Sequence, residues 1–361
     1  MEKVIRIGMD TSKSVFQLHG VNESEKPVLR KKLRRQQVLA FFAKLAPIEV
    51  GLEACGAAHH WARELTALGH RARLVPPQYA KMFVKRGKND AADAEAICEA
   101  MSRPSMRFVP IKSAEQQAAQ MLLGTRDGLV RRRTQLSNRI RGNAAEFGLV
   151  AAKGLARLEP LLARIAADPG VPKLAKDMFA VLAQEYAELD ARLAQAEARL
   201  TAWHRQSELS RRLAEVPCIG PVGATAMTIK VTDPRVFGCG RDFSAWIGLT
   251  AKDHSTAGKL RLGGITRAGD EMLRSILVAG ATAVIQQVKR GRARPSPWLA
   301  ALLQRKPLKL AAVALANKTS RIAWKLMVSG GRYDPSHGRR GLVAPLARQG
   351  EPTEGAVVIG A

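Results

Sequence analysis

The stretch "IEVGLEACGAAHHWARELTALGHRARLVPP" (residues 48–77) predicts a strand, a helix and a second strand. Residues 48–54 form a short apolar run, which is typical of a buried strand. Residues 56–70 are rich in helix formers, and residues 71–77 return to the composition of a strand. Two strands joined through a helix usually lie parallel in one sheet. We therefore expect a mixed α/β domain around this segment.

Upstream, similar patterns predict three further strands and one helix, at residues 4–10, 15–21, 27–33 and 35–46. The resulting order is β-β-β-α-β-α-β, which is typical of a mixed sheet with crossover helices. In this order Asp10 and Glu53 each stand at the carboxyl end of a strand. Open α/β sheets carry their sites at that edge, so both acids are candidate site residues.

The stretch "KNDAADAEAI" (residues 88–97) opens the next predicted helix with two carboxylates, Asp90 and Asp93. Three residues apart on a helix, they share one face, with β-carbons about 5 to 6 Å apart. Their repulsion is tolerable in solvent and is relieved by a divalent cation between them. Together with Asp10 and Glu53 they supply the hard oxygen ligands that suit one or two Mg²⁺ ions. Each acid taken alone is better explained by a helix cap or a surface position.

The rest of the chain predicts a helical middle and a mainly helical carboxy-terminal part. A capping-box signature at Ser113 and Gln116 begins a helix that continues to about residue 147. In a second helix, over about residues 176–203, apolar residues recur at intervals of four and three, at Leu182, Tyr186, Leu189, Leu193, Ala196, Leu200 and Trp203. This heptad seam must pack against another helix, either the preceding one or a helix of a second subunit. The predicted divisions are residues 1–110, 111–205, 206–330 and 331–361, the last being a disordered tail rich in Gly and Pro.

The carboxy-terminal third carries features that suit contact with phosphate. From Met272 to Tyr333 there are twelve Lys or Arg residues and no Asp or Glu. A solvated helix face normally mixes both signs, so this run indicates a phosphate-facing surface. The stretch "EVPCIGPVGATAM" (residues 215–227) places a Gly-Pro turn between two short helical stretches. Such a turn is either a tight helix connection or a source of backbone N–H groups for a phosphate.

A second candidate site lies in "DHSTAGKLRLGG" (residues 253–264), where Ser255 and Thr256 stand in a loop beside His254, Lys259 and Arg261. A serine attacks phosphorus only with help from a base or a metal. The neighbouring cations are suited to holding the phosphate. Taken by itself, the loop is better explained as a phosphate-binding turn than as a nucleophile.

The charge balance and the cysteines narrow the class of protein. The chain carries 58 Lys and Arg against 31 Asp and Glu, a formal charge of +27, which attracts polyanions such as nucleic acid. It shows no signal peptide, and its longest apolar run, "SILVAGATAVI", is too short to span a bilayer. The cysteines form no CxxC pair, which indicates reduced thiols in a cytosolic protein. We expect them to be small buried hydrophobic residues; a zinc site of Cys55 with His59 and His60 is the less favoured alternative.

Five motifs of the chain resemble those of a known family: "IGMDTSK" (7–13), "VGLEACGAAHHWARELTALGH" (50–70), "KNDAADAEAI" (88–97), "VPCIGPVGATA" (216–226) and "FSAWIGLTAKDHSTAGKLRLGGITRAGDEMLR" (243–274). As a set they are similar to the DEDD transposases of the insertion-sequence 110 family, over about residues 3–330. The resemblance implies an α/β plus α fold, with a RuvC-like domain of the RNase H fold, a helical coiled-coil middle and a mainly helical transposase domain. Members of that family are recombinases directed by a structured non-coding RNA, the bridge RNA, which pairs with donor and target DNA.

Carried over by position, the resemblance implies that Asp10, Glu53, Asp90 and Asp93 are the catalytic, metal-binding acids, with Mg²⁺ as cofactor. Ser255 matches the serine that forms a covalent phosphoserine link to DNA. The loop departs from the family at Ala257, where glycine is common, and the adjacent Thr256 offers a second hydroxyl, so either oxygen is a candidate for the attack.

The resemblance also implies the partners of the chain. These are double-stranded donor and target DNA, a bridge RNA, and further copies of the chain in a dimer or tetramer, with the serine of one subunit completing the acidic site of another. Cations near the motifs are the candidates for nucleic-acid binding: Lys85, Arg86, Lys88, Lys259, Arg261 and Arg267. A cytoplasmic, nucleoid-associated location in bacteria follows from the same resemblance.

Three functions compete on the residues alone. The first is a Mg²⁺-dependent DNA recombinase that breaks and rejoins strands through Ser255. The second is a structure-selective nuclease of the junction-resolvase kind, in which water is the nucleophile and no protein stays attached to the DNA. The third is an architectural nucleic-acid-binding protein, in which Asp90→Asn leaves every activity intact. A guide RNA is supported by the resemblance only, since the chain has no RRM or KH signature.

Overall fold

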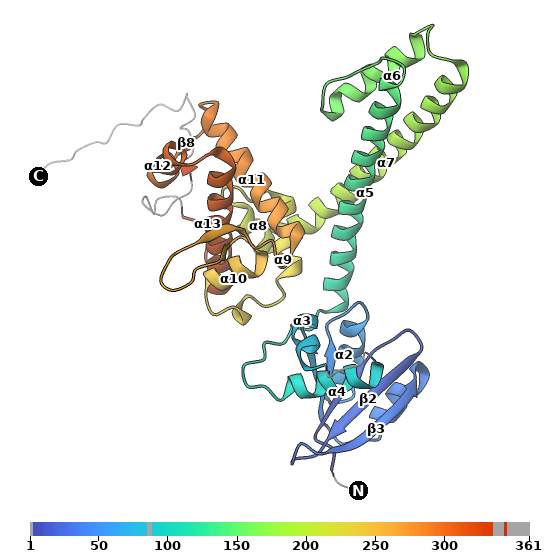
Figure 1. The fold of residues 1–361 in the computed structure, drawn as a ribbon, viewed down its shortest axis with the longest axis vertical. Helices are drawn as coiled ribbons and strands as arrows, with labels where there is room; N and C mark the ends of the chain where they lie inside the picture. The colour runs from blue at the N-terminus through green and yellow to red at the C-terminus, as the bar shows by residue number, and fades with distance from the viewer. Residues whose placement is uncertain (1–2, 85–88, 335–342, 345–361) are drawn as a thin grey trace, which may run out of the picture. The chain divides into compact units, whose positions relative to one another are not determined.

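A five-stranded mixed sheet organises the amino-terminal part of the chain in the computed structural model, which describes residues 3–84, 89–334 and 343–344 (Figure 1). Its strands are β1 (Arg6–Asp10), β2 (Val15–Val21), β3 (Pro27–Arg34), β4 (Glu49–Glu53) and β5 (Arg71–Val75), in the spatial order β3-β2-β1-β4-β5. The pairs β1–β2 and β2–β3 are antiparallel, whereas β4 runs parallel to both β1 and β5. The predicted order β-β-β-α-β-α-β is confirmed.

Helices cover both faces of this sheet. On one face α1 (Val38–Phe42) and α2 (Ala58–Ala67) enclose a core that includes Ile7 and Met9 of β1. On the opposite face α4 (Asp90–Met101) lies against the intervening residue Gly8. Shorter elements complete this part: η1 (Arg35–Gln37), α3 (Pro77–Ala80) and η2 (Lys81–Phe83). The helix expected over residues 35–46 is therefore shorter than predicted.

Glycine allows α4 to lie directly on β1. A β-carbon at Gly8 would come within 2.2 Å of the carbonyl oxygen of Ala94 and 2.5 Å of the amide nitrogen of Cys98. Glycine inside a strand often marks such a close approach of two backbones. The guanidinium of Arg6 holds the same helix, since its Nε donates to the carbonyl of Cys98 at 3.1 Å. Because side chains alternate along a strand, Asp10 emerges on the same face as Gly8, beside α4.

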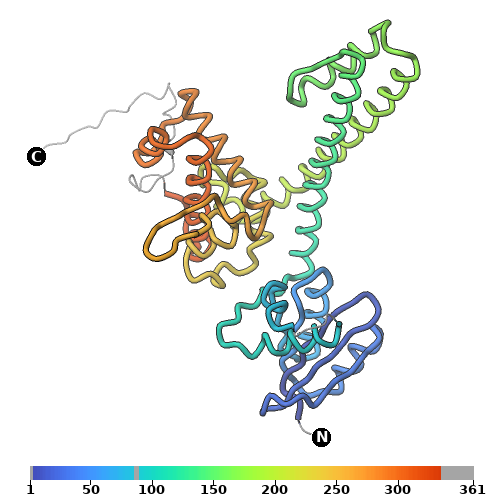
Figure 2. Tube along the Cα trace, in the orientation of Figure 1, coloured from blue at the N-terminus to red at the C-terminus, as the bar shows by residue number. Residues whose placement is uncertain are grey.

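The chain consists of two compact units, Met1–Met121 and Leu122–Ala361. The second unit begins within α5 (Ala114–Ala145), which runs beside α7 (Lys173–Gln206), as Figure 2 shows. Between them come η3 (Leu155–Arg157) and α6 (Leu158–Ala167), a helix that the sequence analysis did not predict.

The heptad seam of α7 packs within the chain. Leu189, Leu193 and Ala196 are buried in one cluster with Leu136 and Ile140 of α5. Ion pairs link the same two helices outside the seam: Arg126 with Glu197, and Arg133 with Asp190. Of the two alternatives left open by the sequence, the internal partner is the one that the structure contains.

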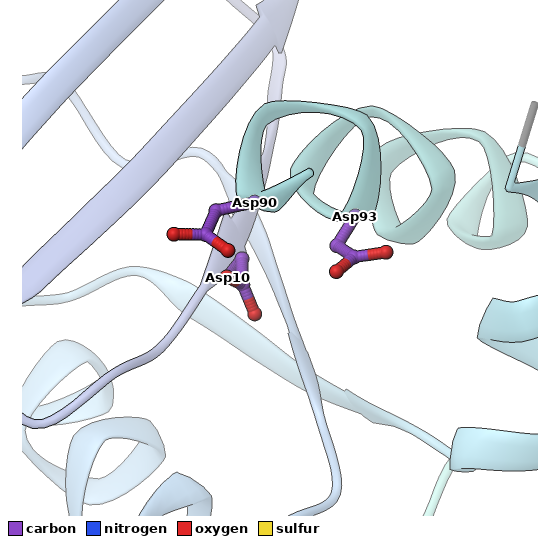
Figure 3. Close-up of side chains that lie close together, drawn as sticks. All are labelled: Asp10, Asp90 and Asp93. Atoms are coloured by element: carbon purple, nitrogen blue, oxygen red, sulfur yellow. The ribbon is translucent and has the colours of Figure 1, made fainter. Parts of the chain in front are cut away.

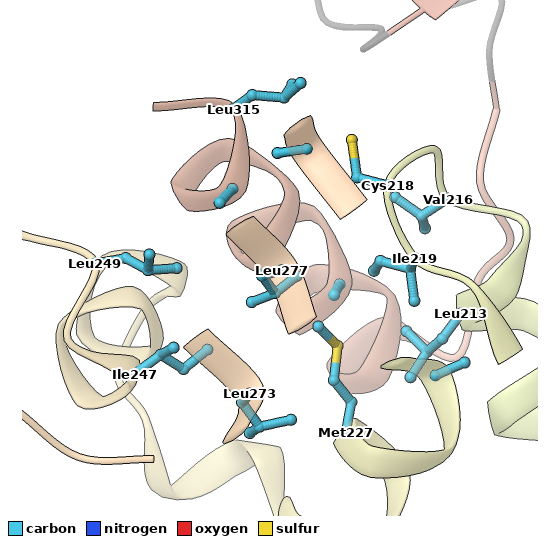
Figure 4. Packing of buried hydrophobic residues seen from close by; sticks show 14 of the residues in the cluster. Leu213, Val216, Cys218, Ile219, Met227, Ile247, Leu249, Leu273, Leu277 and Leu315 are labelled. Carbon is cyan, nitrogen blue, oxygen red and sulfur yellow. The ribbon is translucent and has the colours of Figure 1, made fainter. Parts of the chain in front are cut away.

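The remaining helices form a bundle whose core is drawn in Figure 4. They are α8 (Glu208–Ala214), α9 (Pro221–Lys230), η4 (Pro234–Val236), α10 (Gly240–Ile247), α11 (Glu271–Lys289), α12 (Pro297–Arg305) and α13 (Leu308–Ser329). A hairpin of β6 (Ala251–Asp253) and β7 (Leu262–Ile265) lies between α10 and α11. The Gly-Pro turn does separate two helices, α8 and α9; whether it binds phosphate stays a prediction.

Two further expectations concern the carboxy-terminal tail and membrane-spanning helices. Most of the predicted disordered tail lies outside the described residues; within it, β9 (Val343–Ala344) pairs with β8 (Arg294–Pro295). In the part of the chain that the structure describes, none of the helices is long and apolar enough to cross a membrane.

Candidate functional site

Three of the four predicted acids meet at the carboxyl end of the central strand β1. Asp10 ends β1, and Asp90 and Asp93 project from the first turn of α4 toward it (Figure 3). One carboxylate oxygen from each acid lies within 4.8 Å of the others. Within the described ranges this is the one group of three or more such ligands close enough to hold a metal ion. The predicted convergence of Asp10, Asp90 and Asp93 is thus present.

A local signal orients the first turn of α4. Asn89 is the N-cap, and its side chain accepts a hydrogen bond from the amide of Ala92 at 2.8 Å. Such a cap starts the helix at a defined residue, so Asp90 and Asp93 both fall in the first turn. The positive end of the helix dipole there stabilises their negative charges.

The pKa of Asp10 reflects the crowding of acids around it. Burial, followed by repulsion from Asp93, Asp90 and Glu53, raises the pKa of Asp10 from 3.8 to about 6. A carboxylate whose neighbours are also anionic is costly to ionise, and a cation removes that cost. The site therefore has the properties of a cation site: oxygen donors, close spacing and mutual repulsion, with no ion pair from a described Lys or Arg to these three acids.

Glu53 stands one strand away from this group. It follows Leu52, which pairs with Met9 in the parallel β1–β4 ladder, so Glu53 is the neighbour of Asp10 across the ladder. Its charge contributes to the raised pKa of Asp10, although its oxygens are outside the group within 4.8 Å. The structure thus brings three acids together and leaves the fourth close by, half-buried.

Three carboxylates and a nearby fourth fit Mg²⁺, which binds oxygen ligands and keeps several waters. Asp10, Asp90 and Asp93 would hold the ion, with Glu53 available for a second ion or for a bound water. A cation held by these acids would neutralise negative charge on a phosphodiester.

The serine lies in a hairpin of the second unit. The amide of Ser255 donates to Asp253 Oδ1 at 2.8 Å, and Ser255 Oγ accepts from the amide of Arg261 at 2.9 Å. Residues Ala257 and Gly258 both have positive φ, 49° and 77°, as a two-residue type I′ turn requires. The Ser255 and Thr256 side chains are exposed. The hydroxyl of Ser255 is therefore held by the main chain and open to solvent.

The base of this hairpin is tightly joined to α10. Gly248 has φ of 81°, and a β-carbon there would lie 2.2 Å from the carbonyl oxygen of Ala268. Arg274 bridges the junction, because its Nη1 donates to the carbonyls of Ile247 at 2.9 Å and Ala268 at 2.8 Å. The serine is thus carried by a short, exposed hairpin on a rigid base.

The predicted nucleic-acid-binding cations fall into two groups. Lys259, Arg261 and Arg267 are exposed on or just beyond the hairpin. Lys85, Arg86 and Lys88 lie outside the described residues, so their role stays a prediction. Lys252, Lys259 and Arg261 outnumber the single acid of the hairpin, Asp253, and this excess of positive charge suits contact with a phosphate backbone.

The prediction that all four cysteines are buried is wrong for Cys55 and Cys239. Both are exposed, because one follows the end of β4 and the other caps α10; Cys98 and Cys218 are buried. The zinc alternative gains no support: His59 Nδ1 accepts a hydrogen bond from the amide of Lys112 at 3.1 Å, which leaves the ring proton on Nε2 and neither nitrogen free for a metal.

Sequence reasoning missed two residues that shape the acid site. Gly8 admits α4 against the sheet, and Asn89 starts that helix. Both had usable signals. A glycine inside a strand pattern marks close backbone approach, and Asn before an acidic first turn marks an N-cap.

Comparison with known families gives two matches. A transposase profile of the DEDD type of IS110 matches residues 7–147, a range that contains all four predicted acids. The profile described as the transposase IS116/IS110/IS902 family matches residues 210–295, a range that contains Ser255.

Whole-chain relatives carry transposase names. A protein of Sinorhizobium fredii named as a transposase is 63% identical over 340 residues, which cover 94% of this chain and 88% of that protein. The transposase for insertion sequence element IS1111A of Coxiella burnetii is 40% identical over 336 residues, 92% of each chain. The transposase for element IS1328 of Yersinia enterocolitica is 36% identical over 330 residues, 91% of this chain and 98% of that protein.

Proposed function

This chain belongs to the IS116/IS110/IS902 family of insertion-sequence transposases, and on that premise we propose that it is a Mg²⁺-dependent recombinase that cuts and rejoins DNA through a phosphoserine intermediate. The observation that carries the proposal is the meeting of Asp10, Asp90 and Asp93 within 4.8 Å at the end of β1. Burial and the mutual repulsion of these acids raise the pKa of Asp10, so the cluster is costly to ionise without a bound cation.

The proposal assigns the first unit to the RuvC-like RNase H fold. Support comes from the mixed sheet in the order β3-β2-β1-β4-β5, with antiparallel pairs on one side of β1 and parallel pairs on the other. It also comes from the place of the acids at strand ends, where such sheets carry their chemistry.

In this proposal the four acids position the scissile phosphate. Bound Mg²⁺ supplies charge neutralisation at the non-bridging oxygens and lowers the cost of losing the proton from the attacking hydroxyl. Asp10, Asp90 and Asp93 set where that charge sits, and the sheet and α4 keep the three side chains from spreading apart.

Ser255 is the proposed nucleophile. Its Oγ forms a bond to phosphorus while its proton leaves, and the bond from phosphorus to the leaving oxygen of the DNA strand breaks, giving a strand that ends in a hydroxyl. A hydroxyl of the partner strand then attacks the phosphoserine, which rejoins the DNA and regenerates the serine. The Arg261 amide holds Oγ during this exchange, and the exposed Lys259 and Arg261 side chains suit the phosphate charge.

The remaining parts of the proposal follow from family resemblance. These are a homo-oligomer, guidance by a bridge RNA and action on donor and target DNA. Support from the residues is limited to the excess of basic charge, which suits either nucleic acid. Sequencing of RNA that copurifies with the chain from its host tests the guide, and recovery of random fragments alone contradicts it.

The test of the chemistry is the covalent adduct between protein and labelled DNA from the ends of the element, resolved on a denaturing gel. Ser255→Ala should abolish the adduct, with the adjacent Thr256→Ala as the matched control that keeps it. Asp90→Asn should abolish both adduct and strand cleavage while DNA binding persists. An undiminished adduct in Ser255→Ala removes this residue as nucleophile, and cleaved ends without any adduct favour the hydrolytic alternative.

A further inference from the structure

The edge strand β3 carries three cationic side chains in a line on one face, Arg30, Lys32 and Arg34, which form the cation file. Along the strand these three alternate with Lys31 and Leu33. Leu33 is buried in the core, and Lys31 Nζ lies 4.9 Å from the centre of the Phe41 ring, so these two face α1 and α2. Alternation along a strand then places the other three on the opposite face.

The strand register shows that this opposite face is the one with the acids. In one cross-strand row Asp10 pairs with Gln17, and Gln17 pairs with Lys32. Residues directly opposite each other on neighbouring strands point to the same face. Lys32 therefore lies on the side of Asp10, two strands away, or about 10 Å at a strand spacing of about 4.8 Å.

A second row leads to the same conclusion. Gly8 pairs with His19, and His19 pairs with Arg30. The side of Gly8 is known independently, because a β-carbon there would collide with Ala94 of α4. Arg30 consequently shares the face on which α4 sits.

Within the described residues these cations have no ion-pair partner. Arg30, Lys32 and Arg34 are exposed, and none of the acids in the described ranges forms an ion pair with them. Arg6 on the same face differs, since it pairs with Glu25.

Protection of the sheet edge does not explain the cation file. Charged side chains discourage pairing with another strand wherever they stand along the edge, whereas like charges side by side on one face repel each other. A polyanion bound from outside would neutralise three such cations and relieve the repulsion between them.

We propose that Arg30, Lys32 and Arg34 bind the phosphate backbone of the DNA strand that enters the acid site. This inference rests on the proposed function, because it takes DNA to be the substrate of the acids. Alternate residues of a strand stand about 7 Å apart, which is comparable to the separation of neighbouring phosphates along an extended strand. The cation file offsets the repulsion between the DNA and the acids and sets the direction in which the strand crosses the sheet.

The test compares two triple variants of the full chain. In the face variant Arg30, Lys32 and Arg34 become Gln; in the control Lys31→Gln, Lys44→Gln and Arg71→Gln remove the same charge from elsewhere in the unit. Binding of a fluorescent DNA duplex is measured by anisotropy in EDTA, so that no strand is cut, over a range of salt. The slope of log affinity against log salt is negative, and the face variant should reduce its magnitude by about 2 to 3, at about 0.9 per phosphate contact. The control should lower it by less than one.

Thermal melting of both variants verifies that they remain folded. Equal losses in the two variants, or an unchanged slope in the face variant, overturn the inference. A loss seen only with RNA of the same sequence overturns the assignment to DNA. Failure of the proposed function gives a different result: the wild type then forms no adduct with DNA in the Ser255 test, whatever the β3 variants do.

Discussion

Replacing Asp10 with Asn should stabilise the metal-free first unit at neutral pH while it abolishes strand cleavage. Asn is nearly isosteric with Asp but cannot ionise, so it removes the repulsion from Asp90, Asp93 and Glu53. It also replaces one of the three anionic oxygen ligands expected to hold the cation with a neutral amide oxygen, which binds a divalent cation more weakly. Stability and function should therefore change in opposite directions.

The magnitude follows from the raised pKa of Asp10. The protonated carboxyl favours the folded state by an amount that is fully present below pH 3.8 and lost as the pH rises through about 6. At about 1.36 kcal/mol per unit the upper limit is about 3 kcal/mol, and solvent screening of this half-buried group reduces it to about 1 to 2 kcal/mol. The Asn variant keeps that contribution at all pH values. Its advantage should be complete at pH 7.5, fall to about half by pH 5 and disappear near pH 3.8.

The assay is thermal unfolding in EDTA and in Mg²⁺, following the transition that Mg²⁺ shifts. Mg²⁺ should raise the midpoint of the wild type and leave that of Asp10→Asn nearly unchanged. Glu23→Gln, an exposed acid of the same unit, is the control and should alter neither stability nor the response to Mg²⁺. If Asp10→Asn is no more stable than the wild type at pH 7.5, or if its advantage grows as the pH falls, the repulsive acid cluster is not present in solution.

Three further outcomes are expected. Gly8→Ala should force α4 away from β1, lower the free energy of unfolding by about 1 to 3 kcal/mol and remove the stabilisation by Mg²⁺. The control Gly56→Ala, which has open space around its β-carbon, should have none of these effects, and equal unfolding midpoints for the two variants contradict the packing. Ala257→Gly should keep adduct formation and Ala257→Val should reduce it, because a β-branched residue resists the positive φ of 49° there; equal adduct yields would exclude that turn from the active state. A thiol reagent at pH 8 should modify two of the four cysteines in the folded protein and all four in denaturant, and more than two fast thiols would contradict the burial. The protected ones are Cys98 and Cys218, whose pKa values are raised by burial, and the reactive ones are Cys55 and Cys239.

Much of the acid site was predictable because its signals are local. The end of a strand can be located from an apolar run and a following turn, and two acids three residues apart share a helix face whatever surrounds them. Those two rules place Asp10 at the end of a strand and Asp90 with Asp93 on one helix face, whereas the packing of α4 on Gly8 brings the acids together. The exposure of Cys55 was not predictable in the same way, since a free cysteine is usually buried and its place after β4 decided otherwise.

The heptad spacing in α7 required a partner helix but did not identify which helix it is. Either α5 or a second subunit satisfied the spacing, and only the buried cluster of Leu189, Leu193 and Leu136 distinguishes them. Similarly, the Gly-Pro turn joins α8 to α9 as predicted, while its chemistry has no local signature.

Periodicity and residue chemistry predicted the order of strands and helices in the first unit, the acids as candidate ligands and the excess of positive charge, and the family resemblance added Ser255 as the candidate nucleophile. Folding decided which distant segments face each other: α5 against α7, α4 on Gly8, and the cations of β3 on the side of Asp10. The physical reason is that local patterns depend on neighbours a few residues apart, whereas face and partner depend on strand register and close packing between segments that the sequence separates.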